Sequence, residues 1–228
     1  MSKRIIILLG IIILLTGCSV NNKKTKLNTF PLMYQQRPTT ILVLPPINET
    51  TAPEAKEYFM STLGPSVNAT GYYFLPLEVT TRFLQSEGLY DTEIIDDAVL
   101  PQFKEYFGAD AVMTTRIIEW NKDYHIVGGA VAVAVEFDIR STTTGDTLWK
   151  SYGKVEVDTS SDDSNIIAAL IQTAITTAQT DYIPIAQMVN NMVLETVPVG
   201  QYHPKFNEDG DDEIDEENPG KERMFFRD

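Results

Sequence analysis

Hydrophobic and polar residues alternate most strictly between residues 127 and 140. One set of positions is apolar apart from a glycine, and the intervening set, from residue 130 onward, has three alanines followed by three charged residues. A period of two over this length predicts a long β-strand with one face on a core. Thr144, Gly145 and Asp146 predict a turn and residues 149–157 a return strand, so we expect a long β-hairpin. The apolar set is Val127, Gly129, Val131, Val133, Val135, Phe137 and Ile139.

Shorter patterns place the remaining elements. The apolar run of residues 39–44, which ends at Pro45, predicts a buried strand. Apolar residues at every fourth position from Ala55 to Val67 predict a helix. The other predicted elements are strands at 72–75 and 111–120 and helices at about 79–88, 96–108, 166–180 and 183–197. This order predicts a mixed α/β fold, with a mixed β-sheet and helices packed on it, in a single domain over residues 38–205.

The first 17 residues have the pattern of a signal peptide. Two basic residues precede eleven residues that are apolar apart from one glycine, a stretch too short to span the hydrocarbon core of a membrane. The following residues, Leu15, Thr16, Gly17 and Cys18, resemble the bacterial lipobox. This resemblance implies that the chain is cut before Cys18 and that Cys18 carries the lipid anchor. Ser19 in the next position favours the outer membrane, with the protein facing the periplasm.

Both ends of the mature chain are polar. Residues 18–37 show no periodicity and predict a lipidated flexible tether. Residues 206–228 predict a disordered acidic tail, since eight of the twelve residues from Asn207 to Asn218 are acidic. Met224 to Phe226 follow this acidic stretch, and such apolar residues can serve as a docking peptide.

Composition and charge exclude several functions. The net charge is −14 at pH 7, and it becomes −16 once the signal peptide and its two basic residues are removed, which argues against nucleic-acid binding. One cysteine rules out an internal disulfide and a thiolate zinc site. We therefore expect no metal and no cofactor, and an acidic chain whose attachment to the membrane depends on lipid.

The candidate catalytic residues each have a structural interpretation. His125 stands at a predicted strand end, and His203 lies in a closing segment where packing or hydrogen bonding is expected. The carboxylate pairs at 96–97 and 162–163 precede predicted helices, which explains them as caps. Gly210 is misplaced for a calcium loop that would begin at Asn207. We therefore predict no catalytic residues and no enzyme.

The segments LPPINET, GYYFLP, FGADAV and PVGQYHP together resemble a family of bacterial outer-membrane lipoproteins of unknown function. This family includes a meningococcal genome-derived antigen, and the resemblance covers roughly residues 35–205. More remotely, the strand after GAD and the TGDTLW hairpin are similar to those of the curli-secretion lipoprotein, the lipoprotein activator of a peptidoglycan synthase and the N-terminal domain of TolB. These relatives imply a mixed α/β domain that works by binding partners.

The resemblance implies a non-catalytic periplasmic binding or accessory subunit of an outer-membrane assembly or secretion complex. The implied partner is an envelope protein such as a curli-secretion-like lipoprotein. Ala130, Ala132 and Ala134 form a small-residue strand face that helices or a second copy of the chain could cover, so a homodimer stays open. The alternatives are an oligomeric secretion-channel component and, less favoured, a periplasmic enzyme.

Overall fold

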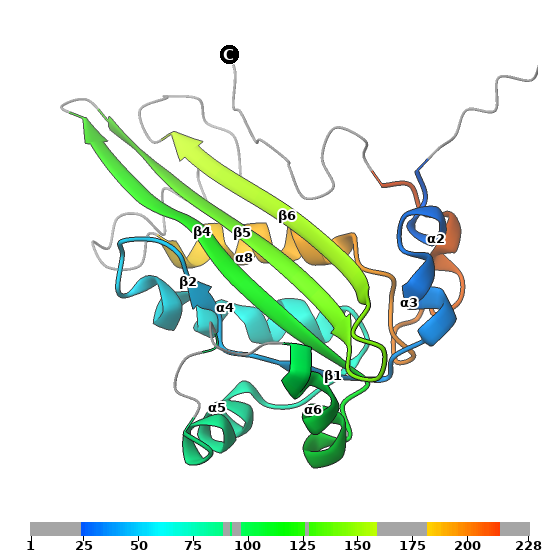
Figure 1. The fold of residues 1–228 in the computed structure, drawn as a ribbon. Helices are drawn as coiled ribbons and strands as arrows, with labels where there is room; N and C mark the ends of the chain where they lie inside the picture. Colours follow the sequence, from blue (N-terminus) through cyan, green and yellow to red (C-terminus); the bar gives the residue numbers. More distant parts are fainter. Residues whose placement is uncertain (1–23, 89–91, 93–96, 126–127, 159–181, 215–228) are drawn as a thin grey trace, which may run out of the picture.

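A six-stranded mixed sheet forms the centre of the computed structural model, which describes residues 24–88, 92, 97–125, 128–158 and 182–214 (Figure 1). The strand order is β3-β1-β4-β5-β6, and the short β2 pairs with β4 beyond this path. β1 runs parallel to β3 and β4, whereas β4, β5 and β6 are antiparallel. The strands are β1 (Thr40–Val43), β2 (Ile47–Asn48), β3 (Tyr73–Phe74), β4 (Ala111–His125), β5 (Gly128–Ser141) and β6 (Thr147–Asp158).

The long hairpin predicted from the alternation is confirmed. β5 pairs with β6 from Ala130 opposite Asp158 to Arg140 opposite Thr147, and β4 extends the sheet on the other side. The odd-numbered residues of β5 point to one face, where Val133, Val135 and Phe137 have no exposed surface. The predicted mixed α/β fold is therefore correct. The two hairpin strands have 14 and 12 residues, whereas a mean strand has about 5–6 residues.

Helices cover the two faces of the sheet unequally. α4 (Ala55–Ala69) and α8 (Tyr182–Glu195) pack on the face that carries the apolar residues of β5. α5 (Leu77–Ser86), η2 (Asp97–Val99) and α6 (Leu100–Phe107) lie against the other face, near β1 and the start of β4 (Figure 1). The predicted helices at these places are confirmed, and the one at 166–180 lies outside the described residues. α8 buries its apolar stripe inside the molecule.

The flexible tether predicted over 18–37 is wrong from Lys24 onward. Residues Lys26–Thr29 form α2 and Pro31–Gln36 form α3, and Phe30 and Met33 are buried in the main core. These two residues stand three positions apart, but two apolar positions in a short polar stretch are too few to establish a helical period, which is why the sequence pattern failed to predict their burial.

The acidic tail predicted from residue 206 is wrong as far as residue 214. η3 (Asp209–Asp211) follows a series of turns, and Ile214 is buried in the same core as Phe30. Thr25 and Glu213 form an antiparallel bridge, so the two chain ends of the domain lie side by side. The domain therefore spans at least residues 24–214.

The FGADAV segment fixes the start of β1 to the start of β4. Gly108 ends α6 with a φ of 65°, a left-handed conformation that favours glycine. The Asp110 carboxylate then accepts hydrogen bonds from the backbone of Thr39 at 2.9 Å and of Thr40 at 3.0 Å. Burial alone would raise the pKa of Asp110, but hydrogen bonds from Lys104, Thr39 and Thr40 outweigh it and hold this pKa well below its ordinary value.

Candidate functional site

Residues 196–206, which follow α8, close one end of the domain, and we call them the closing segment. The backbone amides of Gly200 and Tyr202 donate hydrogen bonds of 2.9 Å to the carbonyls of Thr70 and Gly71. Gly71 has a φ of 78°, and a Cβ added there would collide with the His203 backbone. The segments GYYFLP and PVGQYHP each supply a glycine where the two backbones meet, and a Cβ at Gly200 would collide with the Gly71 carbonyl.

A buried lysine joins the N-terminal helix to this closing segment. Lys26 is 7% exposed, and its Nζ donates a 2.9 Å hydrogen bond to the Val197 carbonyl. The same Nζ lies 3.9 Å from Asp209, which is 1% exposed and accepts a 2.8 Å hydrogen bond from the Val199 amide. Desolvation lowers the pKa of Lys26, while the charges of Asp209 and Asp212 oppose this shift. Two buried side chains thus hold residues from both ends of the chain together.

Tyrosines complete the surroundings of Asp209. Burial raises the pKa of Tyr34, and the charge of the nearby Asp209 carboxylate raises it further. Burial also raises the pKa of Tyr72, whose hydroxyl donates a 2.6 Å hydrogen bond to the Pro198 carbonyl. The Tyr72 hydroxyl therefore ties the end of α4 to the segment that follows α8.

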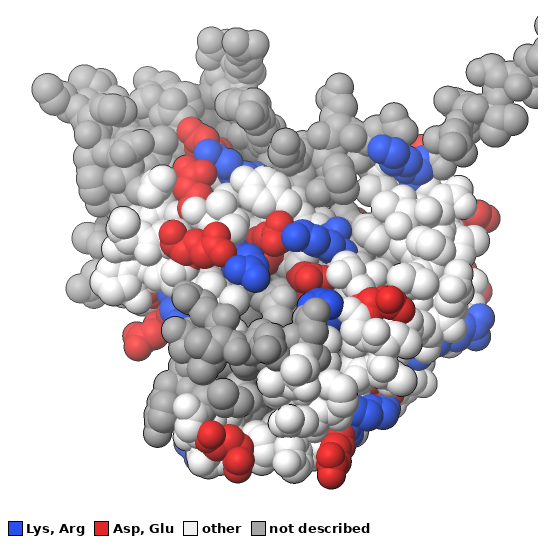
Figure 2. Space-filling view, viewed as in Figure 1, with Lys and Arg blue, Asp and Glu red and all other residues white. Residues whose placement is uncertain are grey.

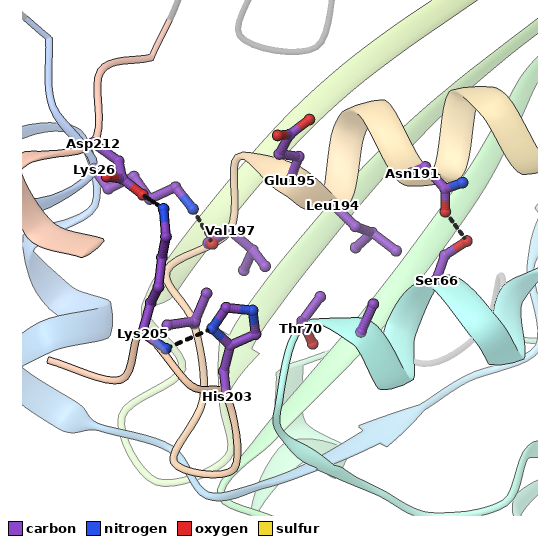
Figure 3. Close-up of a pocket in the computed structure, with 12 residues that line it drawn as sticks. Lys26, Ser66, Thr70, Asn191, Leu194, Glu195, Val197, His203, Lys205 and Asp212 are labelled. Atoms are coloured by element: carbon purple, nitrogen blue, oxygen red, sulfur yellow. Dashed lines mark hydrogen bonds and ion pairs between the residues drawn. The ribbon is translucent and has the colours of Figure 1, made fainter. Parts of the chain in front are cut away.

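A cleft of about 560 Å³ opens between this closed end and the two inner helices (Figure 3). α4 supplies Ser66 and its C-cap residue Thr70, and α8 supplies Asn191 and Glu195. The closing segment and the chain ends supply the remaining charged groups, among them Lys26, His203, Lys205 and Asp212. The cleft therefore combines hydroxyl, amide, imidazole and both signs of charge.

The polar groups of the cleft are engaged with one another. The Ser66 hydroxyl donates a 2.6 Å hydrogen bond to Oδ1 of Asn191. His203 Nδ1 accepts a 3.1 Å hydrogen bond from the Lys205 amide, and the Lys205 ammonium lies 3.5 Å from the Asp212 carboxylate. A hydroxyl activated for nucleophilic attack needs a base beside it. Here Ser66 bonds to Asn191 and His203 bonds to the Lys205 amide, so the histidine is not placed as a base for the serine. This geometry favours a role in stabilising the fold or binding a ligand, and not nucleophilic catalysis.

A second candidate surface is the face of β4, β5 and β6 that points away from α4 and α8. We call it the outer sheet face, and Figure 2 shows acidic and basic side chains gathered across it. Lys150 Nζ lies 3.0 Å from Glu136, whose carboxylate is also 3.9 Å from Arg116. Lys154 Nζ lies 2.8 Å from Glu119 and 3.1 Å from Glu156. The ionic residues of the outer sheet face are Arg116, Glu119, Glu136, Lys150, Lys154 and Glu156.

Ala134 of β5 is explained by one of these ion pairs. Ala134 stands between Glu119 of β4 and Lys154 of β6 in the strand register. The Glu119–Lys154 ion pair therefore joins two strands across Ala134, which has no exposed surface. A larger side chain at this position would obstruct the ion pair. At Ala134, the small-residue face is thus covered by the charged side chains of the neighbouring strands.

The residues singled out from the sequence lie in several places. Leu15, Thr16, Gly17 and Cys18 lie outside the described residues, as does the carboxylate pair at 162–163. His125 ends β4, and His203 lies in the closing segment with the packing and hydrogen bonding expected of it. Among the residues that the structure describes, no group of three or more His, Cys, Asp or Glu is arranged to hold a metal ion.

Lys26 and Asp209 were missed by the sequence patterns. Lys26 falls in a basic, aperiodic stretch and Asp209 in an acidic one, and both stretches are typical of solvated segments. The available signals were Thr25, which caps α2, and the single apolar Ile214 within the acidic stretch. Neither signal could show that the two stretches meet.

The fold and the N-terminal segment define a class of protein, the lipid-anchored lipoproteins of the bacterial envelope. A model of the prokaryotic membrane lipoprotein lipid attachment site matches residues 3–19. Within the part of the chain that the structure describes, no helix has the length and hydrophobicity to cross a membrane. The family model described as "Putative lipoprotein GNA1162-like" matches residues 30–198, so the chain belongs to this family and the resemblance found in the sequence is confirmed.

The chain is also similar to individual proteins. The chain is 22% identical over 173 residues to lipoprotein NMB1124/NMB1162 of Neisseria meningitidis serogroup B, covering 76% of this chain and 80% of that one. It is similar to the crystal structure of lipoprotein GNA1162 from Neisseria meningitidis, with a TM-score of 0.50, 24% identity and coverage of 61% and 96% of the two chains. The PelC dodecamer from Paraburkholderia phytofirmans gives a TM-score of 0.41 at 15% identity, covering 71% and 89%. The first of these structures supports the fold.

Proposed function

We propose that this lipoprotein is a non-catalytic accessory subunit that binds an envelope protein from the periplasmic side of the outer membrane. Cys18 carries the lipid, and the domain of residues 24–214 presents the binding surface. Family membership supports the envelope location, and the lipid attachment pattern that includes Leu15 to Cys18 supports the anchor.

The outer sheet face is the observation that carries the proposal. Its ionic side chains are held in a fixed pattern by cross-strand pairs, with Lys150 52% exposed and Arg116 46% exposed. Such charges stabilise the fold little at a solvated surface. Charges ordered over three long strands instead supply complementarity to a partner, which determines specificity and association rate. The same charges make this face unsuited to contact with lipid acyl chains.

The engaged groups of the cleft support a non-catalytic role. Ser66 hydrogen-bonds to Asn191 and not to His203, and His203 Nδ1 is occupied by the amide of Lys205. Lys26 and Asp209 are buried and hold backbone groups of the closing segment. In this proposal the cleft residues maintain the domain, and partner binding takes place on the sheet.

In-cell cross-linking of tagged full-length protein, followed by mass spectrometry of the membrane fraction, tests the proposal. We expect another envelope protein to be recovered covalently attached to this chain. Recovery of the chain linked only to itself would contradict the accessory role. The matched control is Cys18→Ala, which should lose palmitate labelling and lose the adduct. Persistence of palmitate labelling in that variant would contradict attachment at Cys18.

A further inference from the structure

The two edges of the sheet differ in length and in regularity. β3, at one edge, has two residues, whereas β6, at the other, has twelve. A long edge strand presents a row of backbone N–H and C=O groups, and proteins protect such a row with a proline, a bulge or a covering segment. β6 contains no proline, and the bulge in its pairing with β5 lies before Trp149. The rest of this edge is therefore a regular strand.

Within the described residues, the edge of β6 is open from Lys150 to Glu156. β6 pairs with β5 alone, and no backbone hydrogen bond from another described segment reaches these seven residues. α3 packs at the start of the strand, where the rings of Phe30 and Trp149 lie 6.3 Å apart. α8 packs beneath β6 on its inner face. Beyond α3, no described helix runs along the outer edge of β6 (Figure 1).

The side chains that β6 sends to the outer sheet face have a symmetric arrangement of charge. They are Lys150, Tyr152, Lys154 and Glu156. Lysines on an edge strand discourage unspecific pairing. Lys150 and Glu156, however, stand three residues on either side of Gly153, and their side chains are 52% and 47% exposed. A two-fold axis at Gly153 therefore sets Lys150 opposite Glu156 of the partner subunit, twice in each dimer.

The charges select one register among its neighbours. With the axis at Gly153, Tyr152 lies opposite Lys154 of the partner subunit, where an ammonium group can contact the aromatic ring. An axis at Tyr152 would set Lys150 opposite the partner's Lys154, and an axis at Lys154 would set the two Lys154 residues opposite each other. Like charges that face each other across two strands are destabilising. An axis between two residues would join the outer face of one copy to the inner face of the other.

We infer that the edge of β6 is an interface between two copies of this chain, paired antiparallel over Lys150 to Glu156 about an axis at Gly153. The same surface is used by both copies, so the assembly closes at two. The two sheets become one continuous sheet, and both outer sheet faces lie on the same side of it. The envelope partner of the proposed function then meets two adjoining copies of its binding surface. The pairing itself does not rest on that function.

A pair of cysteines tests the interface in full-length lipidated protein in cell membranes. Lys150→Cys and Glu156→Cys, combined in one chain, are about 20 Å apart along the strand, which is too far for a bond within the chain. In the dimer each cysteine faces a cysteine of the partner subunit at a distance that suits a disulfide. We expect a covalent dimer on a non-reducing gel after mild oxidation. Each single variant is a matched control and should stay monomeric, as should the native chain with Cys18 alone.

Charge reversal tests the register by a different readout. Lys150→Glu sets two glutamates opposite each other at both ends of the interface, so the dissociation constant of the dimer should rise by about tenfold. Glu156→Lys should have a similar effect. The variant that carries both substitutions restores opposite charges and should return the dissociation constant to near the native value. Analytical ultracentrifugation of the full-length protein in detergent measures all four proteins, and the restoration separates pairing from a change in the fold.

The outcomes separate this inference from the proposed function. Monomeric native protein at every concentration, with no disulfide in the double-cysteine variant, would overturn the dimer. Disulfides equally abundant in the single variants, or charge reversals that the combined variant does not restore, would overturn the register at Gly153. These results would leave the adduct with an envelope protein untouched. A covalent dimer in cells that yield no envelope adduct would support the interface and contradict the proposed function.

Discussion

Strands β1 and β5 flank β4 in the same sheet, but their faces are covered differently. In β1, Ile41 belongs to the core under α4 and α8, while Leu42 belongs to the core under α5 and α6. In β5, Phe137 is fully buried, whereas the neighbouring Glu136 points to solvent and pairs with Lys150. A continuous apolar run thus marks a strand covered on both faces, and an alternating one marks a strand with one face that no described helix covers, called here the free face. The free face is the part of the sheet available to a partner.

The largest expected effect contrasts two neighbouring positions of β5. Phe137→Ala removes a ring that packs 6.3 Å from the ring centres of Phe59 and Trp149, and it should lower the free energy of unfolding by about 3–5 kcal/mol. Glu136→Ala, one residue away on the outer face, should change it by less than about 1 kcal/mol. Urea denaturation of both variants checks the contrast. Similar losses at the two positions would contradict the assignment of one free face.

The corresponding pair in β1 should behave differently. Ile41 and Leu42 are both fully buried on opposite faces, so Ile41→Ala and Leu42→Ala should each cost about 2–5 kcal/mol. The same urea titrations measure both. A large loss at Ile41 together with a negligible one at Leu42 would show that α5 and α6 do not cover the second face in solution.

An intermediate effect is expected at the start of β1. Asp110→Asn weakens the hydrogen bonds to Thr39 and Thr40 and the ion pair with Lys104, at a cost of about 1.5–3 kcal/mol at pH 7. Because the folded-state pKa of Asp110 is lowered, its carboxylate stabilises the fold above the unfolded-state pKa of 3.8, and this contribution decreases as the pH falls below that value.

Unfolding of the native chain and of Asp110→Asn between pH 3 and pH 7 measures this dependence. The difference between the two proteins should narrow toward pH 3. A difference independent of pH would show that the carboxylate charge plays no part. Asp146→Asn, on the neighbouring exposed turn, is the matched control and should leave stability almost unchanged.

The smallest effect concerns the ion pairs of the outer sheet face. A double-mutant cycle with Glu119→Ala and Lys154→Ala should give a coupling energy of about 0.2–1 kcal/mol, reduced by salt. Ala134→Leu should remove most of this coupling, since the larger side chain lies between the two partners. A coupling unaffected by Ala134→Leu would contradict the explanation given for the small-residue face.

The sequence predicted the sheet and its helices because these have a strong period. Residues 127–140 alternate over the whole strand, and Ala55 to Val67 repeat at helical spacing. The closed end was not predictable in the same way. Lys26 and Asp209 are separated by 183 positions, lie in polar stretches without a period and become buried only because each finds a partner. Contacts of this kind depend on tertiary structure and leave no local pattern.

The ion pair across Ala134 was also beyond the sequence patterns. The three alanines were recognised as a small-residue face, but period alone does not distinguish a face covered by helices from one covered by neighbouring side chains. The register of β4, β5 and β6 was needed to place Glu119, Ala134 and Lys154 in one row.

The central claim is that the outer sheet face binds the partner, and site-specific photo-cross-linking in cells tests it most directly. A benzoylphenylalanine replaces Tyr152, which lies opposite Glu136 on that face, or Tyr106 on α6 as the matched control. The account predicts an adduct with another envelope protein in the membrane fraction from position 152 and none from position 106. Adducts from position 106 alone, or none from position 152 when chemical cross-linking still captures the partner, would contradict it.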